Sequence, residues 1–488
     1  MKNSILLLLL IGFSFKGFAQ ILSSAADTQA LINVIPFPQA SATMIVSFNA
    51  KMLDITTMPS ARIKRQPLNE LLKRYEKDKT DINLLCDIYY ANKEKNDPQS
   101  GMSYLQLAFN KAVELYELNP SNLEHLEQMT DILIEVNRMP DVPELWASYT
   151  ERNPEVAKGW AKLAVYQVQM LDTLGSKNSI EKAFTLDPEL PEIYVAALLE
   201  VIYKMIIQMQ TLGEKAVIKA DLSFFENALS QKPNSEIAKL SYNAAKLFEL
   251  FYGVMIANVD KFGMDKSFKM DLTERQKTEW AELEKAFKAQ LTNPKVVNKF
   301  MMLKSLLVLE VIRGEPDMAI AYLEESKKYI ESDVDLYKIL SFGFIPLKKY
   351  QKAIPYLKTA TDLSPNFDDF FALARLYFEN HEYSMSVDIL EMLLQSFPKK
   401  TDIIMGMISI QMREGKFEEA CSTLFRLQDL YRDELNFEDE DPYFPFYKAV
   451  CTLVYSKNKA EAKKVLQGVI DKDLPWSEEA KELMKRFF

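Results

Sequence analysis

The sequence holds few of the residues that most often carry out chemistry in proteins. Two histidines and three cysteines occur among 488 residues, and glycine is scarce at 13. A glycine-rich phosphate loop, a Gly-x-Ser-x-Gly elbow and a His-Glu-x-x-His pair are all missing. The sequence therefore predicts a protein that is not an enzyme and that carries no metal ion or other cofactor.

The sequence also lacks an excess of basic charge and, beyond its start, any long apolar run. Its formal net charge is −10, whereas a nucleic-acid partner requires a basic stripe. After residue 19, no stretch reaches the roughly 18 uninterrupted apolar residues that a membrane-spanning helix needs. Hydrophobic residues make up 48% of the chain, which argues against disorder. We expect an ordered chain with no nucleic-acid partner and no transmembrane segment once it is mature.

Residues 1–19 have the pattern of a secretory signal peptide. Lys2 supplies the positive end, a short apolar run follows, and Gly17 and Ala19 are the small residues of a cleavage site. An uncleaved amphipathic anchor is the alternative. Since the residue directly after this segment is Gln20 and not a cysteine, we do not expect a lipid anchor. The sequence predicts an exported bacterial protein, either periplasmic or extracellular.

The three cysteines are too few, and odd in number, for a disulfide framework. Cys421 and Cys451 fall on consecutive predicted helices that should run antiparallel side by side. Cys86 is far from both in the sequence. We expect buried free thiols. A Cys421–Cys451 bridge in an oxidising compartment is the alternative.

One pattern recurs four times between about residues 301 and 427. Four leucines are spaced 34, 33 and 34 residues apart: Leu323, Leu357, Leu390 and Leu424. A small residue precedes each leucine by four positions: Ala319, Ala353, Ser386 and Ala420. A turn residue comes before each pair: Gly314, Lys348, His381 and Gly415. A period near 34 is typical of stacked helix-turn-helix units.

The pattern has a geometric reason. Residues four apart share one face of a helix, so a small residue lets two helices approach and the leucine fills the space beside it. Burying one such leucine stabilises the fold by roughly 1.5–3 kcal/mol. Because one helix pair cannot bury its apolar face alone, the units must stack on one another.

The residues of these units resemble the tetratricopeptide repeat. The resemblance is carried by the following positions: Ala353, Leu357, Ala360 and Pro365 in one unit, and Phe370, Leu373, Ala374, Tyr377, Tyr383, Ser386, Leu390 and Pro398 in the next. It implies an all-α fold, a helix-turn-helix solenoid or superhelix. It also implies that the first helix of each unit lines a concave side, where such proteins bind peptides or helices.

A second repeat signature is visible in the N-terminal half. Pro120, Pro154 and Pro188 are 34 residues apart, and the next such prolines, Pro233 and Pro294, follow after 45 and 61 residues. We expect degenerate repeats over 68–260, an elbow near 261–271, and clear repeats over 272–488. The two half-solenoids would meet at that elbow, a helix would start at Asp271–Glu274, and residues 477–488 would close the stack.

Residues 20–67 differ from the rest and predict an extended N-terminal arm. Pro36 and Pro38 exclude a helix interior. Residues 44–48 alternate in hydrophobicity. We expect the arm to pack along the first repeats. The alternative is that it pairs strand-wise with another chain.

The candidate partner-binding residues lie on the first helices of the clear units. They are Phe342, Ile345, Phe371, Arg375, Phe378, Met405, Met412 and Arg413. An apolar, methionine-rich lining suits adaptable recognition of a peptide or helix. The alternative is that these side chains contact neighbouring first helices or the arm.

The other polar features have ordinary structural interpretations. His381 should sit in a turn and His125 on a polar helix face, where too few ligands for a metal are nearby. The acidic stretch 432–441 lacks the spacing of an EF-hand and should be a solvated loop. The acidic residues of 124–135 should face water, with a basic partner as the alternative.

Taken together, these patterns predict a non-enzymatic scaffold or adaptor of the bacterial cell envelope that binds a protein or peptide in its concave groove. The alternative is an accessory protein that binds carbohydrate or nutrients for an envelope uptake system. Such proteins use exposed tryptophans to stack on sugars, and only four scattered tryptophans occur here.

Overall fold

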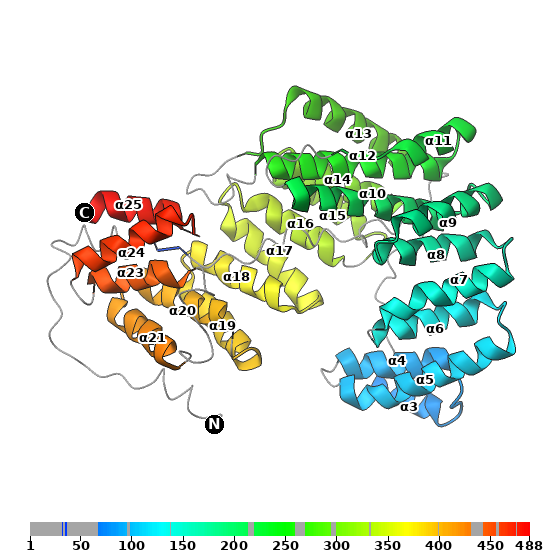
Figure 1. Cartoon of the computed structure of the whole chain (residues 1–488), viewed down its shortest axis with the longest axis horizontal. Coiled ribbons are helices and arrows are strands. Elements are labelled where there is room, and N and C mark those ends of the chain that lie inside the picture. The colour runs from blue at the N-terminus through cyan, green and yellow to red at the C-terminus, as the bar shows by residue number, and fades with distance from the viewer. Residues whose placement is uncertain are drawn as a thin grey trace. The chain divides into compact units, whose positions relative to one another are not determined.

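The computed structural model describes residues 32, 35–36, 67–94, 98–136, 138–212, 219–258, 269–293, 299–330, 333–398, 400–430, 443–454, 458–474 and 476–488. Within these ranges the chain forms 22 α-helices and no β-strand. Consecutive helices pack on one another as antiparallel hairpins (Figure 1). This is the predicted all-α stack of tetratricopeptide-like helical hairpins.

The chain divides into two compact units. The N-terminal unit comprises residues 48–349, and the C-terminal unit comprises residues 350–488 together with residues 1–47. The predicted elbow near 261–271 falls largely outside the described residues and stays a prediction. The signal peptide at 1–19 and the acidic stretch at 432–441 also lie outside them.

Among its described residues, the N-terminal unit has fourteen helices. They are α3 (Leu68–Tyr75), α4 (Ile82–Glu94), α5 (Pro98–Leu118), α6 (Leu123–Glu135), α7 (Val142–Arg152), α8 (Ala157–Gln169), α9 (Thr173–Leu186), α10 (Pro191–Leu212), α11 (Ser223–Gln231), α12 (Glu236–Ala257), α13 (Glu274–Thr292), α14 (Lys299–Ile312), α15 (Pro316–Ser326) and α16 (Val334–Phe344).

The C-terminal unit continues the same architecture. Its helices are α17 (Tyr350–Leu363), α18 (Phe367–Glu379), α19 (Tyr383–Ser396), α20 (Thr401–Arg413), α21 (Phe417–Leu430), α23 (Phe444–Val454), α24 (Lys459–Asp471) and α25 (Ser477–Phe487). The last helix packs on its predecessor, and its role in closing the stack stays a prediction.

The prolines of the N-terminal half lie in the turns that precede the first helix of each hairpin, as their spacing predicts. In four turns the residue before the proline accepts a hydrogen bond from the N–H three positions on, at 3.0–3.2 Å; these acceptors are Asn119, Asn153, Asp187 and Lys232. Proline suits the second position of such a turn because its φ is already set. The next helix begins three residues after each proline, in α6, α8, α10 and α12.

The turn inside each clear hairpin has a left-handed residue. The predicted turn residues Gly314, Lys348, His381 and Gly415 have φ of 77°, 53°, 62° and 76°. In each turn the residue after this position donates its N–H five residues back, the bond of a Schellman motif. The turn between α8 and α9 repeats this arrangement at Leu171, with φ of 62°, which the sequence does not signal.

The predicted spine of small and leucine side chains is buried. All eight residues of the four pairs have exposed fractions of 0–2%. Ser386 takes the place of alanine in α19 by donating its hydroxyl hydrogen to the Ala374 carbonyl of α18, at 2.7 Å. The small residue therefore permits close approach of the two helices of a hairpin and, at this position, also joins them.

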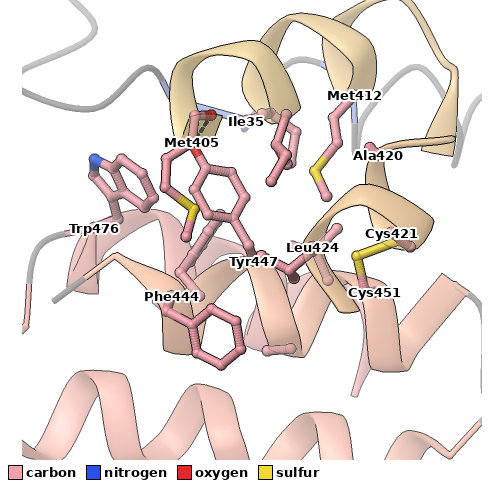
Figure 2. Packing of buried hydrophobic residues seen from close by; sticks show 14 of the residues in the cluster. Ile35, Met405, Met412, Ala420, Cys421, Leu424, Phe444, Tyr447, Cys451 and Trp476 are labelled. Atoms are coloured by element: carbon pink, nitrogen blue, oxygen red, sulfur yellow. Dashed lines mark hydrogen bonds between the residues drawn. A yellow bond between two sulfur atoms is a disulfide. The ribbon is translucent and has the colours of Figure 1, made fainter. Parts of the chain in front are cut away.

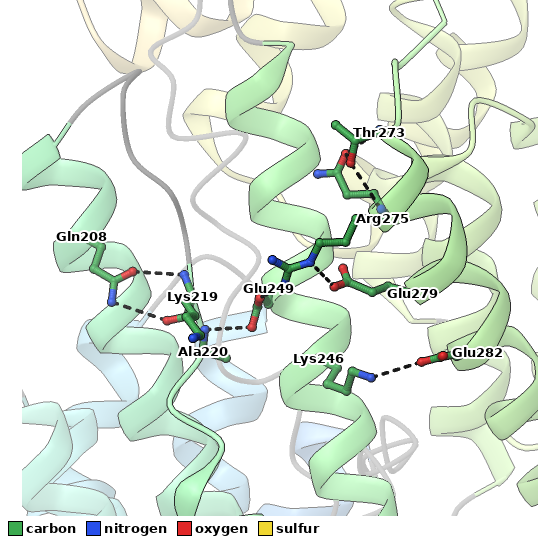
Figure 3. Close-up of polar contacts among 10 residues, drawn as sticks. Gln208, Lys219, Ala220, Lys246, Glu249, Thr273, Arg275, Glu279 and Glu282 are labelled. Atoms are coloured by element: carbon green, nitrogen blue, oxygen red, sulfur yellow. Dashed lines mark hydrogen bonds and ion pairs between the residues drawn. The ribbon is translucent and has the colours of Figure 1, made fainter.

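Where the repeat stretches, hydrogen bonds tie the long helices together (Figure 3). The Gln208 amide of α10 bonds the backbone of Lys219 in both directions, at 3.3 and 3.5 Å. The carboxylate of Glu249 in α12 accepts from the Ala220 N–H at 2.9 Å and from Arg275 of α13 at 3.3 Å. Glu249 therefore joins the segment before α11 to both α12 and α13.

The start of α13 differs slightly from the prediction. The sequence favours a helix start at Asp271–Glu274, but Thr273 is the N-cap. Its hydroxyl accepts from the Gln276 N–H, and the Gln276 side chain accepts from the Thr273 N–H. Threonine followed by glutamine three residues later is a capping box, and it satisfies two backbone donors that Asp271 would leave unpaired.

The spine gives a direct stability prediction. Leu390→Ala should lower the free energy of unfolding by roughly 2–5 kcal/mol, because it leaves a cavity beside Ser386. Met392→Ala, two residues along the same helix and 40% exposed, should change it by less than about 0.5 kcal/mol. Urea-induced unfolding followed by circular dichroism measures both. Equal effects of the two substitutions would contradict the burial of the spine.

The left-handed turn gives a prediction of opposite sign. Leu171→Gly should raise the free energy of unfolding by roughly 1 kcal/mol, because glycine tolerates positive φ and a leucine side chain does not. Leu174→Gly should lower it by roughly 0.5–1 kcal/mol, because this equally exposed leucine is helical. The same unfolding assay tests both, and a destabilised Leu171→Gly variant would argue against the positive φ.

Candidate functional site

The C-terminal unit holds part of the N-terminal arm against α20 and α23. The side chain of Ile35 is fully buried in an apolar cluster with Met405, Met412 and Tyr447 (Figure 2). Ile32 packs against the same cluster. The expectation that the arm packs along the first repeats is therefore wrong for these residues, because they contact the last repeats instead.

Arg413 fixes the backbone of the arm. Its Nε donates a hydrogen bond to the Ile35 carbonyl oxygen at 2.6 Å. Its guanidinium carbon also lies 5.2 Å from the centre of the Phe378 ring of α18, within cation–π range. Arg413 is the last residue of α20, directly before the Gly415 turn. The side chain therefore links the arm, α18 and α20.

Tyr447 of α23 forms the other side of this contact. Its hydroxyl lies 3.4 Å from the Pro36 carbonyl oxygen and bonds the Ser409 hydroxyl of α20. Trp476 packs edge-on against its ring, with centroids 5.0 Å apart. The Ser409 hydrogen bond and the Trp476 ring contact come from helices and not from the arm. The surface is thus built by the helices themselves.

The structure brings together three of the eight predicted lining residues at the arm: Met405, Met412 and Arg413. Phe371 and Phe378 are buried in the neighbouring apolar cluster of α18–α20, and Arg375 is half-buried on α18. Phe342 and Ile345 are half-buried and belong to the N-terminal unit. Partner binding by these eight residues stays a prediction, while the alternative contact with the arm applies to three of them.

Sequence reasoning missed Ser409, Tyr447 and Trp476. The repeat period would have to be carried across the acidic stretch 432–441 to find Tyr447. Tyr447 contacts Met405 at a separation of 42 residues, rather than the 34 of the clear repeats. The inserted residues shift the register, so the spacing that identifies the lining of α18 and α20 does not identify that of α23.

Cys421 of α21 and Cys451 of α23 form a disulfide, with their Cα atoms 5.4 Å apart (Figure 2). The expectation of free thiols at these positions is therefore wrong. Helix packing places both side chains at 0% exposure on facing helices, a proximity that sequence spacing alone does not decide. Closing a loop of 30 residues stabilises a fold by roughly 2–4 kcal/mol.

Two acidic residues of α6, Glu127 and Glu135, interact with neighbouring side chains of the chain itself. Glu127 pairs with Lys158 and Lys162 of α8, at 3.0 and 3.4 Å. Glu135 accepts a hydrogen bond from the Tyr89 hydroxyl at 2.8 Å. Burial, together with this bond, raises the pKa of Tyr89 to about 12. The expectation of a solvated acidic face therefore holds for Glu124 and Asp131, which are exposed, but not for Glu127 and Glu135, which are half-buried and paired.

The two histidines lie in different units. His381 lies in the turn after α18, as predicted, and its Nδ1 lies 3.1 Å from the Tyr383 hydroxyl. His125 is in the first turn of α6. Across the described ranges, no three side chains of histidine, cysteine, aspartate or glutamate gather in a way that would hold a metal ion.

The N-terminal unit has an open cleft of about 300 Å³ between α11, α12 and α13. Lys239 and Glu236 on its wall form an ion pair at 3.1 Å, and the buried Gln290 Oε1 atom has no hydrogen-bond partner. The described lining includes no histidine, cysteine or serine. The two charged side chains of this lining neutralise each other in that ion pair, and we assign the cleft no function.

None of the helices in the described ranges combines the length and the hydropathy that a membrane crossing requires. No protein-family model matches the chain, and no curated protein matches it in sequence.

Several solved structures are similar to the chain. A tetratricopeptide repeat protein from Parabacteroides merdae is 13% identical, with a TM-score of 0.36 over 62% of this chain and 98% of that one. A human IFIT1 dimer with PPP-AAAA is 14% identical, with a TM-score of 0.39 over 94% and 98%. Yeast Tom70 is 13% identical, with a TM-score of 0.32 over 86% and 90%. At these identities and TM-scores, the likenesses carry nothing about ligands or activity.

The cysteine assignment predicts a thiol count. The denatured chain should bind one equivalent of iodoacetamide without reductant, at Cys86, and three after reduction. In the folded protein, burial and neighbouring carboxylates raise the pKa of Cys86 to about 11. Its alkylation should therefore be slow at pH 7 and accelerate by roughly tenfold per pH unit up to that pKa. Mass spectrometry measures both, and three reactive thiols in the unreduced chain would contradict the bridge.

Proposed function

We propose that this protein is a non-enzymatic scaffold of the bacterial cell envelope, and that the helix lining of its C-terminal unit binds a segment of a partner protein. The observation that carries the proposal is the seated arm. Ile35 and Pro36, which are not part of a helix, lie against α20 and α23. The Ile35 side chain is buried, and its carbonyl oxygen accepts a hydrogen bond from Arg413.

The chemistry of the lining supports binding of a peptide segment. Methionine side chains at 405 and 412 are flexible and polarisable, so they adapt to apolar side chains of different shape. The Arg413 guanidinium donates to a main-chain carbonyl, an acceptor that every peptide offers. A lining that combines apolar contacts with main-chain recognition is typical of grooves that bind peptides.

Two features support export. Residues 1–19 have the composition of a signal peptide. The Cys421–Cys451 disulfide is of a kind that persists in oxidising compartments and is rare where thiols are kept reduced. Both favour the periplasm or the cell exterior as the place where the scaffold works.

The tryptophans do not favour the carbohydrate-binding alternative. Trp146 is fully buried and Trp476 is 6% exposed. Trp160 and Trp280 donate their ring N–H to backbone carbonyls, and a Lys182 ammonium and an Arg313 guanidinium cover their faces. Each ring therefore makes contacts within the fold, which does not favour a role in stacking on a sugar.

The proposal is tested by site-specific photo-cross-linking. A benzoylphenylalanine placed at Arg375, half-buried on α18, should form an adduct with one envelope protein in the native host. The same group placed at Met392, on the outer helix α19, is the matched control and should form none. Cross-linking of the same proteins from both positions, or from neither, would contradict binding at this lining.

A further inference from the structure

We infer that the surface formed by α20 and α23 is a binding site for an apolar segment of the type Ile-x-x-Ile-Pro, and that residues 32–36 of this chain are its internal occupant. A partner segment of the same chemistry would displace them. This inference rests on the proposed function, since it names the class of segment that the lining takes.

The first requirement of the site is a branched aliphatic side chain. Ile35 is 0% exposed, and it fills the space between Met405, Met412 and Tyr447 (Figure 2). A charged or small side chain in its place would either bury a charge or leave a void among these residues. The site therefore selects for bulk without polarity at this position.

A second aliphatic side chain three residues earlier completes the apolar contact. Ile32 packs against the same cluster and reaches the Gly415 turn, where an added Cβ would lie 3.6 Å from its Cδ1. The Ile35 N–H points back to the Ile32 carbonyl oxygen at 3.4 Å. One turn of chain thus presents both isoleucines to one surface.

The third requirement is an acceptor followed by proline. Arg413 binds the Ile35 carbonyl oxygen at 2.6 Å, and Tyr447 lies 3.4 Å from that of Pro36. Proline has no N–H to satisfy and restricts its predecessor to extended conformations. Two carbonyl oxygens are therefore presented to the donors at low conformational cost. The groups at this contact recognise the shape and the acceptors of the segment.

The surface does not depend on the arm for its own construction. Ser409 bonds Tyr447, the Cys421–Cys451 disulfide joins α21 to α23, and Trp476 packs on the Tyr447 ring. None of these three contacts includes Ile32, Ile35 or Pro36, so removal of these residues leaves the partners of each contact in the chain. A site that stays formed and loses its occupant is available to another segment.

Covalent attachment gives the arm an advantage over a free peptide. A segment tethered to its own binding site acts at an effective concentration on the order of 1 mM. A free peptide must compete with it, so the wild-type protein should bind such a peptide much more weakly than a variant whose arm is released. This difference is what distinguishes an internal occupant from an ordinary part of the core.

The probe is a fluorescein-labelled peptide with the sequence of residues 30–38, measured by fluorescence anisotropy. It should bind the mature Ile32→Asp/Ile35→Asp variant at least about tenfold more tightly than wild type. Adding Arg413→Ala to that variant should weaken binding by about tenfold, as loss of an anchoring arginine does. The matched control Lys416→Ala, at the exposed turn after α20, should leave binding unchanged.

A second protein guards against misfolding of the double variant. A site-specific protease sequence inserted between residues 50 and 51 is cut after the wild-type arm has docked, and the labelled peptide is then added in excess. Exchange of the peptide into the cut protein supports the inference. Failure to bind either protein overturns it, while the photo-cross-linking at Arg375 still tests the scaffold proposal on its own.

Two other results would also overturn the inference. Equal affinity of wild type and the released variant would show that the arm does not compete. A dimer by light scattering, dissociated by Ile32→Asp/Ile35→Asp, would show that the arm occupies the site of a second copy instead. A peptide carrying Asp at the Ile35 position should not bind in any case.

Discussion

The close approach of helices that pair a small residue with a leucine four positions later is the contact on which the fold depends. At each of four successive hairpins both side chains are buried, with exposed fractions of 0–2%. Because a single hairpin cannot bury this face, every unit is stabilised by its neighbours. The identity of residues at other positions is then free to vary, which explains how sequences with little identity adopt the same hairpin.

Much of the fold was predictable because its determinants are local. A proline fixes φ and a left-handed residue ends a helix over a few residues, so Pro120, Pro154 and Pro188 and the Gly314 and Gly415 turns are legible without any knowledge of packing. Leu171 shows the limit of this reasoning. Backbone hydrogen bonds of the turn accompany a leucine in a conformation that its side chain disfavours, and the residue type does not signal it.

The candidate site was predictable only in part, because its contacts are remote in sequence. Met405, Met412 and Arg413 follow from helical periodicity. The bond from Arg413 to Ile35 spans 378 residues, and no spacing rule connects the two. The disulfide partners likewise lie on helices separated by a stretch outside the repeat period, so their pairing depends on the packed structure rather than on the pattern.

The disulfide has a consequence for how the chain responds to proteolytic cleavage. It joins α21 to α23, on either side of residues 431–442. A single backbone cut anywhere between those helices would leave the two fragments covalently linked, so that the closing helices stay attached to the stack. The protein would then migrate as one chain on a non-reducing gel and as two on a reducing gel, with its packed helices retained.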